Sequence, residues 1–174
     1  RALENFGVGT AWVGRNARPT GQCTVSLDAN GVPHYDVLRD MAYDHIRLTP
    51  QAQADIRASR FDALYFGTLI QRAPESRAAL RQIAADCRPE TVFCDVNLRP
   101  GCYDAESVRF CLEQATVLKV SMEEEPALRA LGLYAVTEDT PRGIARALAE
   151  RFGQLRTVLL TLGKDGAYGY RTEN

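Results

Sequence analysis

The sequence predicts an α/β fold with a central, mostly parallel sheet, helices on both faces of that sheet and a small antiparallel β lid. From residue 49 onward, apolar runs typical of buried strands alternate with amphipathic helix patterns, as in a parallel sheet that is covered on both sides. Before residue 49, apolar and polar side chains alternate on either side of an Asn-Gly pair, which indicates a β-hairpin. The 174 residues therefore divide into a hairpin region and one α/β region.

Residues 1–48 are expected to contain a leading strand and the lid hairpin, which covers residues 21–38. Asn30 and Gly31 are expected to form a two-residue turn, because both residue types tolerate positive φ angles. One hairpin face is apolar and the other is polar, so we expect the hairpin to be covered on one side only. The apolar positions are Cys23, Val25 and Leu27.

Residues 49–174 are expected to form part of one α/β domain. A helix begins after Thr49, whose side chain can cap it and which is followed by Pro50 at the first helical position. Apolar residues recur on one face of three further helices, expected over residues 74–87, 104–115 and 140–153. Strands are expected over residues 61–67, 91–97, 116–121 and 156–162, with a fifth beginning near residue 167.

The composition argues against several classes of partner. A net charge of −1 gives no basic surface for a nucleic acid, and no apolar run approaches the roughly 18 residues needed to span a membrane. The five cysteines show no CxxC spacing and the two histidines lie far apart, which argues against a zinc site or a disulfide framework. We expect a cytoplasmic protein with buried thiols at Cys87, Cys94 and Cys111.

The segment TVFCDVNLRP, residues 91–100, ends a predicted buried strand with three polar side chains. Asp95, Asn97 and Arg99 stand at every second position, so they point the same way if the chain stays extended. Ligands of parallel α/β sheets bind just beyond the carboxyl ends of strands, and a guanidinium fork suits phosphate or carboxylate oxygens. The alternative is that Asp95 pairs with Arg99 or caps a loop, and that Arg99 is solvated.

Two further polar segments are expected at the same edge of the sheet. KVSMEEEPAL, residues 119–128, places three glutamates at a predicted helix start, where they either favour the helix dipole or provide a ligand for nucleotide-bound Mg²⁺. TLGKDGAYGY, residues 161–170, is either a turn between two strands or a backbone segment that approaches a ligand. The sequence contains no P-loop, GxGxxG or GxSxG motif.

Taken in order, these segments resemble the PfkB (ribokinase-type) family of carbohydrate kinases, in its fructokinase-like branch, over essentially all 174 residues. PTGQCTVSLDANG resembles the lid that covers the sugar, and DVNLRP resembles a strand end of the fructokinase and 2-keto-3-deoxygluconate kinase branch. KVSMEEE is similar to the Asn-x-x-Glu segment of the family, and LTLGKDGA to the strand and turn beside the nucleotide. The resemblance implies a ribokinase-like fold in which residues 49–174 form part of the nucleotide- and sugar-binding domain.

The resemblance also implies roles for individual residues. Asn97 and Arg99 would contact the sugar or the transferring phosphoryl group, and Asp95 would orient them. Glu124 would hold Mg²⁺ through water, while Ser121 stands where the family pattern has Asn. Candidates for contact with sugar hydroxyls are Thr24, Ser26 and Tyr35, and candidates for contact with ATP are Lys119, Ser121, Thr161, Gly163 and Lys164.

The implied activity is transfer of the ATP γ-phosphate, with Mg²⁺, to a hydroxyl of a small sugar, most simply fructose. Two alternatives stay open: a 2-keto-3-deoxygluconate kinase, for which only Arg99 is an obvious cation, and a non-catalytic ligand-binding module of the same fold. The glycine-rich amino-terminal motif and the Gly-Ala-Gly-Asp segment of the family are not in this sequence. We therefore expect a central fragment that lacks the catalytic aspartate and is inactive alone, and a homodimer through the lid.

Overall fold

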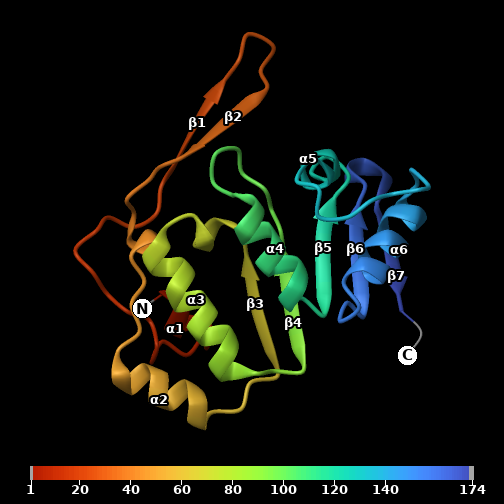
Figure 1. Ribbon diagram of the computed structural model, residues 1–174. Helices are drawn as coiled ribbons and strands as arrows, with labels where there is room; N and C mark the ends of the chain where they lie inside the picture. Colours follow the sequence, from red (N-terminus) through yellow and green to blue (C-terminus); the bar gives the residue numbers. More distant parts are fainter. Residues whose placement is uncertain (1, 173–174) are drawn as a thin grey trace.

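The computed structural model describes residues 2–172, which form a five-stranded sheet with helices and a separate two-stranded hairpin (Figure 1). The strand order is β3-β4-β5-β6-β7, in which β3 to β6 run parallel and β7 runs antiparallel to β6. The predicted mostly parallel sheet is confirmed, and so is its fifth strand. The bounds are β3 Ala63–Gly67, β4 Thr91–Asp95, β5 Val117–Ser121, β6 Thr157–Thr161 and β7 Ala167–Arg171.

The helices between the strands begin where the sequence predicts caps. The side chains of Thr49, Asp104 and Thr140 each accept a hydrogen bond from a backbone N–H in the first turn of the following helix, which satisfies donors that have no partner within the helix. The α-helices are α2 Pro50–Ala58, α3 Pro74–Cys87, α4 Ala105–Gln114, α5 Glu125–Ala130 and α6 Pro141–Arg151. Short 3₁₀ helices are η1 Ala42–Asp44, η2 Leu69–Gln71 and η3 Gly163–Asp165.

The main hydrophobic core lies between one face of the sheet and helices α3, α4, α5 and α6, which all contribute residues to one buried cluster. On the sheet side the cluster contains Cys94, Leu118, Val120, Val158 and Leu160. The apolar faces predicted for residues 104–115 and 140–153 are confirmed, since Val108, Cys111, Leu112, Ala115, Ile144, Leu148 and Phe152 are all buried. On α3 the prediction holds for Leu80, which is buried, but Ile83 is only partly buried. Burial stabilises the fold by roughly 1.5–3 kcal/mol for each large apolar side chain.

The thiols only partly match the expectation. Cys94 and Cys111 are fully buried, as predicted, but Cys87 at the end of α3 is only half-buried. Cys102, which lies in no apolar pattern of the sequence, is buried against Arg72. The helix period places Cys87 on the apolar face of α3, but the last turn of this helix extends past the core.

The opposite face of the sheet is less well covered. Tyr65 is 67% exposed although its ring contacts Phe93 on the neighbouring strand. The sequence predicts a second layer of helices on this face, but no helix within residues 2–172 buries the Tyr65 side chain. Strands β3 and β4 contain apolar residues on both faces, so each face is suited to burial. The apolar pattern does not specify which segment covers each face.

The hairpin consists of β1 Cys23–Leu27 and β2 Pro33–Val37 and extends away from the sheet domain (Figure 1). The expected two-residue turn is wrong: five residues, 28–32, connect the strands. Asp28 organises this loop, because its carboxylate accepts hydrogen bonds from the N–H groups of Asn30 (2.8 Å) and Val32 (2.9 Å). The expected cover on the apolar face is also missing in the described residues, where Leu27 is 68% exposed.

The leading strand expected in residues 1–48 is not present in the described residues before β1. This region contains the short helix α1, Ala2–Asn5, followed by loops up to the hairpin. These loops contain Gly7, Gly9 and Gly14, and glycine weakens strands because it has no side chain to pack. Within residues 2–172, no helix is both long enough and apolar enough to cross a membrane.

Candidate functional site

The polar residues at the carboxyl ends of β4 and β5 meet at one edge of the sheet. Asp95 and Lys119 are paired in the register of these parallel strands, and the Lys119 Nζ lies 3.0 Å from the Asp95 Oδ1. The contact is an ion pair without a well-aligned hydrogen bond. Both side chains are partly buried, so each carries a charge that the other compensates. Lys119, expected near ATP, is therefore held by Asp95 at the edge of the sheet.

Asn97 and Arg99 of the DVNLRP segment do not continue the strand that contains Asp95. Strand β4 ends at Asp95, and Asn97 has a φ of +39°, a left-handed conformation that Asn adopts more readily than most residues. The expected common direction depended on an extended chain, so that expectation is wrong. The predicted alternative of an Asp95–Arg99 pair is not formed either. Arg99 is exposed and, within residues 2–172, its side chain makes no hydrogen bond or ion pair.

The loop that carries Asn97 and Arg99 is nevertheless held firmly at its base. The Val96 N–H donates to the carbonyl of Lys119 (3.2 Å), and the Thr68 hydroxyl donates to the Val96 carbonyl (2.7 Å). Val96 and Leu98 are buried. The exposed guanidinium of Arg99 therefore stands on a fixed backbone, as a group that positions a phosphate or carboxylate should.

Glu124 joins this loop to the end of β5. Its Oε1 accepts a hydrogen bond from the Leu98 N–H (2.6 Å), and its Oε2 accepts one from the Ser121 N–H (2.8 Å). The Ser121 hydroxyl in turn accepts from the Glu124 N–H (3.2 Å), which completes the reciprocal Ser-x-x-Glu capping pattern. A carboxylate has about four lone-pair sites, so Glu124 keeps acceptor capacity for a metal-bound water. Among residues 2–172, no three His, Cys, Asp or Glu side chains gather as a preformed metal centre.

A cavity of about 640 Å³ opens beside the ends of β5 and β6, within the size range of small-ligand sites. Three of the predicted nucleotide residues, Ser121, Thr161 and Gly163, line it together with Glu123, Asp165 and Gly166. Lys164 lies on the same turn but is exposed outside the cavity lining. The predicted alternative of a turn between two strands is confirmed, since Gly163 and Gly166 have positive φ angles and the Leu162 N–H donates to the Gly166 carbonyl (2.8 Å).

The lid residues expected at the sugar do not share one face of the hairpin. Thr24 pairs with Asp36 and Ser26 with His34, whereas Tyr35 pairs with Val25. Directly opposed residues lie on the same face of a sheet, so Tyr35 is on the apolar face and Thr24 and Ser26 are on the polar face. All three side chains are exposed. A single sugar could contact the polar pair or Tyr35, but not both from one side of the hairpin.

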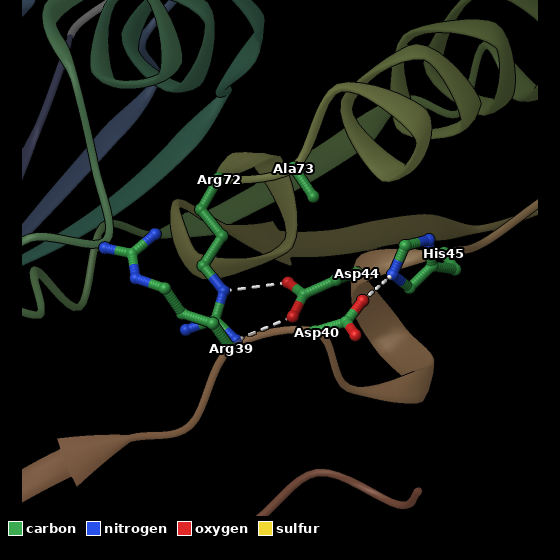
Figure 2. A pocket seen from close by; sticks show the side chains of 6 residues that line it. All are labelled: Arg39, Asp40, Asp44, His45, Arg72 and Ala73. Atoms are coloured by element: carbon green, nitrogen blue, oxygen red, sulfur yellow. Dashed lines mark hydrogen bonds and ion pairs between the residues drawn. The ribbon is translucent and has the colours of Figure 1, made fainter. Parts of the chain in front are cut away.

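Two arginines that the sequence analysis missed lie at the base of the lid, around a smaller cavity of about 190 Å³ (Figure 2). Arg39, two residues after β2, donates to the carbonyl of Gly101 in the loop that carries Arg99. Arg72, after η2, is almost fully buried and pairs with Asp44 through two hydrogen bonds. Neither residue follows a recognisable motif, because the contacts link segments more than 25 residues apart in the sequence.

The electrostatics of this region centre on the Arg72–Asp44 pair. Burial by itself would raise the pKa of the Asp44 carboxyl, but hydrogen bonds from Arg72 and from the Met41 N–H outweigh burial and hold that pKa below its ordinary value. The same hydrogen bonds with Asp44 raise the pKa of Arg72 above its ordinary value despite burial. Both groups are therefore charged at neutral pH.

The solved structures that share the fold of this chain include two fructokinases and a nucleoside kinase. A fructokinase from Vibrio cholerae O395, in a form bound to fructose, ADP and calcium ion, has a TM-score of 0.71 and 20% identity and covers 99% of this chain and 55% of that protein. A fructokinase from Xylella fastidiosa with bound ATP has a TM-score of 0.69 and 18% identity, covering 98% and 52%. A nucleoside kinase from Burkholderia thailandensis in complex with inosine has a TM-score of 0.62 and 13% identity, covering 99% and 50%.

At these identities the structural similarity shows the fold alone, and the chain spans about half the length of these three proteins. No match is found among curated protein sequences. The family model of pfkB carbohydrate kinases, in contrast, matches residues 1–174, which is the whole sequence. The chain belongs to the PfkB family of carbohydrate kinases.

Proposed function

We propose that the full-length protein that contains this chain is a sugar kinase, which uses Mg·ATP to phosphorylate a hydroxyl of a small sugar, with fructose as the first candidate. One observation carries this proposal beyond family membership. Glu124 bonds the loop of Arg99 to the turn of Ser121 (2.6 and 2.8 Å), and this turn lines the larger cavity. This link would keep Arg99, the candidate for contact with phosphoryl oxygens, close to a space suited to a nucleotide.

In the proposed reaction, a sugar hydroxyl oxygen attacks the γ-phosphorus, the bond from that phosphorus to the β–γ bridging oxygen breaks, and ADP leaves. Such transfers depend mostly on positioning and on charge stabilisation. Arg99 would contact the transferring phosphoryl oxygens, and Ser121, Thr161 and Gly163 would contact ATP. Mg²⁺, with Glu124 bonded to one of its waters, would neutralise phosphate charge. The hydroxyl proton would pass to the Gly-Ala-Gly-Asp aspartate, which the sequence resemblance assigns to another part of the protein.

We further propose that residues 1–48 act as the lid and residues 49–174 as part of the nucleotide- and sugar-binding domain. Lids of this kind exclude water from the reacting groups. The exposed apolar residues of the hairpin, Val25, Leu27 and Tyr35, would suit contact with the lid of a second copy. Light scattering of the full-length protein should then give the mass of a dimer, and a monomeric mass at micromolar concentration would contradict this part. The five free cysteines fit a reducing cytoplasm.

The test of the kinase activity is ADP release by the full-length protein with Mg·ATP and, in parallel, fructose, 2-keto-3-deoxygluconate, ribose or adenosine. We expect turnover with one sugar and a loss of about 100-fold or more in kcat/KM on Arg99→Ala. Arg109→Ala, at an exposed position on α4, is the matched control and should be neutral. A folded protein that binds ATP but turns over no sugar would support the non-catalytic binding module instead.

Arg39 favours one alternative substrate class, an acidic sugar such as 2-keto-3-deoxygluconate. In the sequence only Arg99 is an obvious cation for a carboxylate, but Arg39 donates a hydrogen bond to the same loop, at the Gly101 carbonyl. Two guanidinium groups at one loop could bind a carboxylate and a phosphoryl group separately. If the acidic sugar is the substrate, Arg39→Ala should raise its KM by about tenfold or more. If Arg39→Ala raises the KM for the acidic sugar no more than it raises the KM for fructose, the neutral sugar is favoured.

A further inference from the structure

Arg72 is an unusual residue because its charged side chain is only 3% exposed, whereas arginine is seldom fully buried. All three of its guanidinium nitrogens donate hydrogen bonds. The Nε and Nη2 bind the two oxygens of Asp44 (2.7 and 2.8 Å), and Nη2 also contacts the Tyr43 hydroxyl (2.8 Å). The remaining acceptors are the carbonyls of Val37 and Leu38 and the thiol sulfur of Cys102.

The partners of Arg72 belong to three separate parts of the fold. Val37 and Leu38 are at the base of the lid, where β2 ends. Tyr43 and Asp44 belong to η1, which follows the lid. Cys102 closes the loop that carries Arg99, since its N–H donates to the Arg99 carbonyl (2.9 Å). One guanidinium therefore links the lid, the segment after the lid and the loop at the sheet edge.

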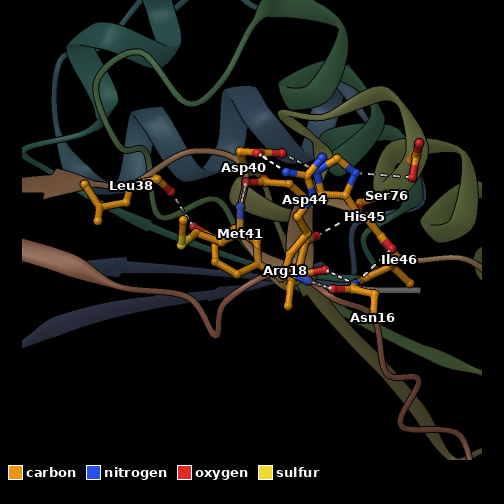
Figure 3. Close-up of polar contacts among 12 residues, drawn as sticks. Asn16, Arg18, Leu38, Asp40, Met41, Asp44, His45, Ile46 and Ser76 are labelled. Carbon is orange, nitrogen blue, oxygen red and sulfur yellow. Dashed lines mark hydrogen bonds and ion pairs between the residues drawn. The ribbon is translucent and has the colours of Figure 1, made fainter.

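The η1 side of this link is rigid. Asp44 accepts a further hydrogen bond from the Met41 N–H (3.0 Å; Figure 3). The Tyr43 carbonyl accepts one from the Ser76 hydroxyl on α3 (2.7 Å). The Ser76 hydroxyl also accepts from the Ile46 N–H (2.9 Å). By contrast, four of five residues in β2 and all of β1 are exposed. The lid is thus a lightly covered hairpin whose base is bonded to a fixed point.

The geometry of the guanidinium makes Arg72 hard to replace. A bidentate pair with a carboxylate fixes the plane of the fork, and in that plane the other donors face the two lid carbonyls and Cys102. A lysine could keep the charge beside Asp44, but its single ammonium presents three donors at one point and cannot span acceptors on three segments. Direction, and not charge alone, is what Arg72 contributes.

We propose that Arg72 is a positioning residue that sets the base of the lid against the Arg99 loop, so that sugar binding depends on it more than ATP binding does. The proposal rests on the proposed kinase function, because a lid that covers the sugar is part of that function. The larger cavity lies beside β5 and β6, and the contacts of Arg72 lie at the lid and the β4 loop. A loosened lid should therefore weaken binding of the sugar and leave binding of ATP almost unchanged.

The experiment compares Arg72→Lys with Arg77→Lys in the full-length protein. Arg77 is a matched control, because it is also a partly buried arginine that forms ion pairs, one with Asp104 and one with Glu106. Its remaining partner is the Gln71 carbonyl, so none of its partners is in the lid. We expect Arg72→Lys to raise the KM for the sugar by about tenfold or more and the KM for ATP by less than about twofold. Equal changes in both KM values, or a fall in kcat alone, would overturn the proposal.

Hydrogen exchange gives a readout that does not require turnover. Backbone amides of residues 23–37 should exchange about tenfold faster in Arg72→Lys than in Arg77→Lys, measured well below the unfolding temperature of each variant. Unchanged exchange in a folded Arg72→Lys protein would refute the anchoring role. If wild-type protein shows no sugar kinase activity but this difference is seen, the proposed function fails and the lid anchor stands.

A milder variant covers the case in which Arg72→Lys does not fold. Tyr43→Phe removes a single partner of Arg72 and keeps the ring that packs near the guanidinium. It should fold, raise the sugar KM by about two- to fivefold and leave the KM for ATP unchanged. No change in the sugar KM would count against the proposal.

Discussion

The most informative single substitution is Glu124→Gln, because it separates a structural role of this carboxylate from a role in metal binding. Both carboxylate oxygens accept backbone hydrogen bonds, from Leu98 at 2.6 Å and from Ser121 at 2.8 Å. Glutamine keeps one accepting oxygen but turns an NH₂ group towards the second backbone N–H. One charge-assisted bond is lost and a partly buried donor is left without an acceptor.

The expected cost follows from those two changes. A hydrogen bond to a charged group contributes about 1.5–3 kcal/mol, and an unsatisfied donor costs a similar amount. Because the site is only partly buried and water can reach part of it, we expect Glu124→Gln to lower the free energy of unfolding by about 2 kcal/mol. Ser121→Ala, which removes only the reciprocal cap from the hydroxyl (3.2 Å), should cost about 1 kcal/mol.

The assay is urea unfolding of the full-length protein in EDTA, so that no Mg²⁺ contributes to stability. Glu123→Gln is the matched control, since Glu123 is exposed one residue earlier and should change the free energy of unfolding by less than about 0.5 kcal/mol. If Glu124→Gln unfolds at the same urea concentration as the wild type, the idea that this carboxylate joins the ends of β4 and β5 is refuted. In a second series with Mg²⁺ in place of EDTA, a loss of stability seen only there would assign Glu124 to the metal alone.

Three further predictions concern the fold. Leu118→Ala, at a fully buried position of β5, should lower the free energy of unfolding by about 2–5 kcal/mol. Leu27→Ala, in the exposed lid, should leave the free energy of unfolding of a monomer nearly unchanged. Equal effects of the two substitutions would contradict the assigned core. Gly143→Ala should destabilise by about 1–3 kcal/mol, because a Cβ there would lie 2.1 Å from the Glu138 carbonyl oxygen, while Gly153→Ala, with open space around it, serves as the control. The pKa of Asp44 is lower in the folded protein than in the unfolded chain. The contribution of this carboxylate to the free energy of unfolding is therefore present above the unfolded pKa and is lost as pH falls below about 4. Between pH 6 and pH 3 the urea midpoint should fall less steeply in Asp44→Asn than in the wild type, and identical slopes would show that the pair with Arg72 does not couple folding to pH.

Part of this protein can be understood from the sequence alone. The order of strands and helices follows from hydrophobic periodicity, as in α4 and α6, whose predicted inward residues are all buried. The helix starts follow from Thr49, Asp104 and Thr140, whose side chains reach donors within three residues along the chain. These features depend on interactions between near neighbours in the sequence, which is why a local pattern can reveal them.

The site depended on contacts that no local pattern contains. Asn97 leaves the extended conformation directly after β4, so the three polar residues of DVNLRP do not share the direction that strand alternation predicts. The sequence places Glu124 at a predicted helix start, but the bond from the Leu98 N–H to this carboxylate spans 26 residues. Metal binding and strand bridging both require a carboxylate, and the sequence could not tell these roles apart.

The lid hairpin is predictable from the sequence, but its attachment to the rest of the protein is not. Sequence alternation determined that residues 23–37 form a hairpin, because each strand faces its partner a few residues away. Only the tertiary structure decided how that hairpin is held, since Arg72 is 34 and 35 residues distant from the lid carbonyls that it binds. In the sequence Arg72 is one of many arginines, most of which are on the surface. The hydrogen bonds to Asp44 and to the lid carbonyls are what fix this guanidinium in direction, and they form only in the folded chain.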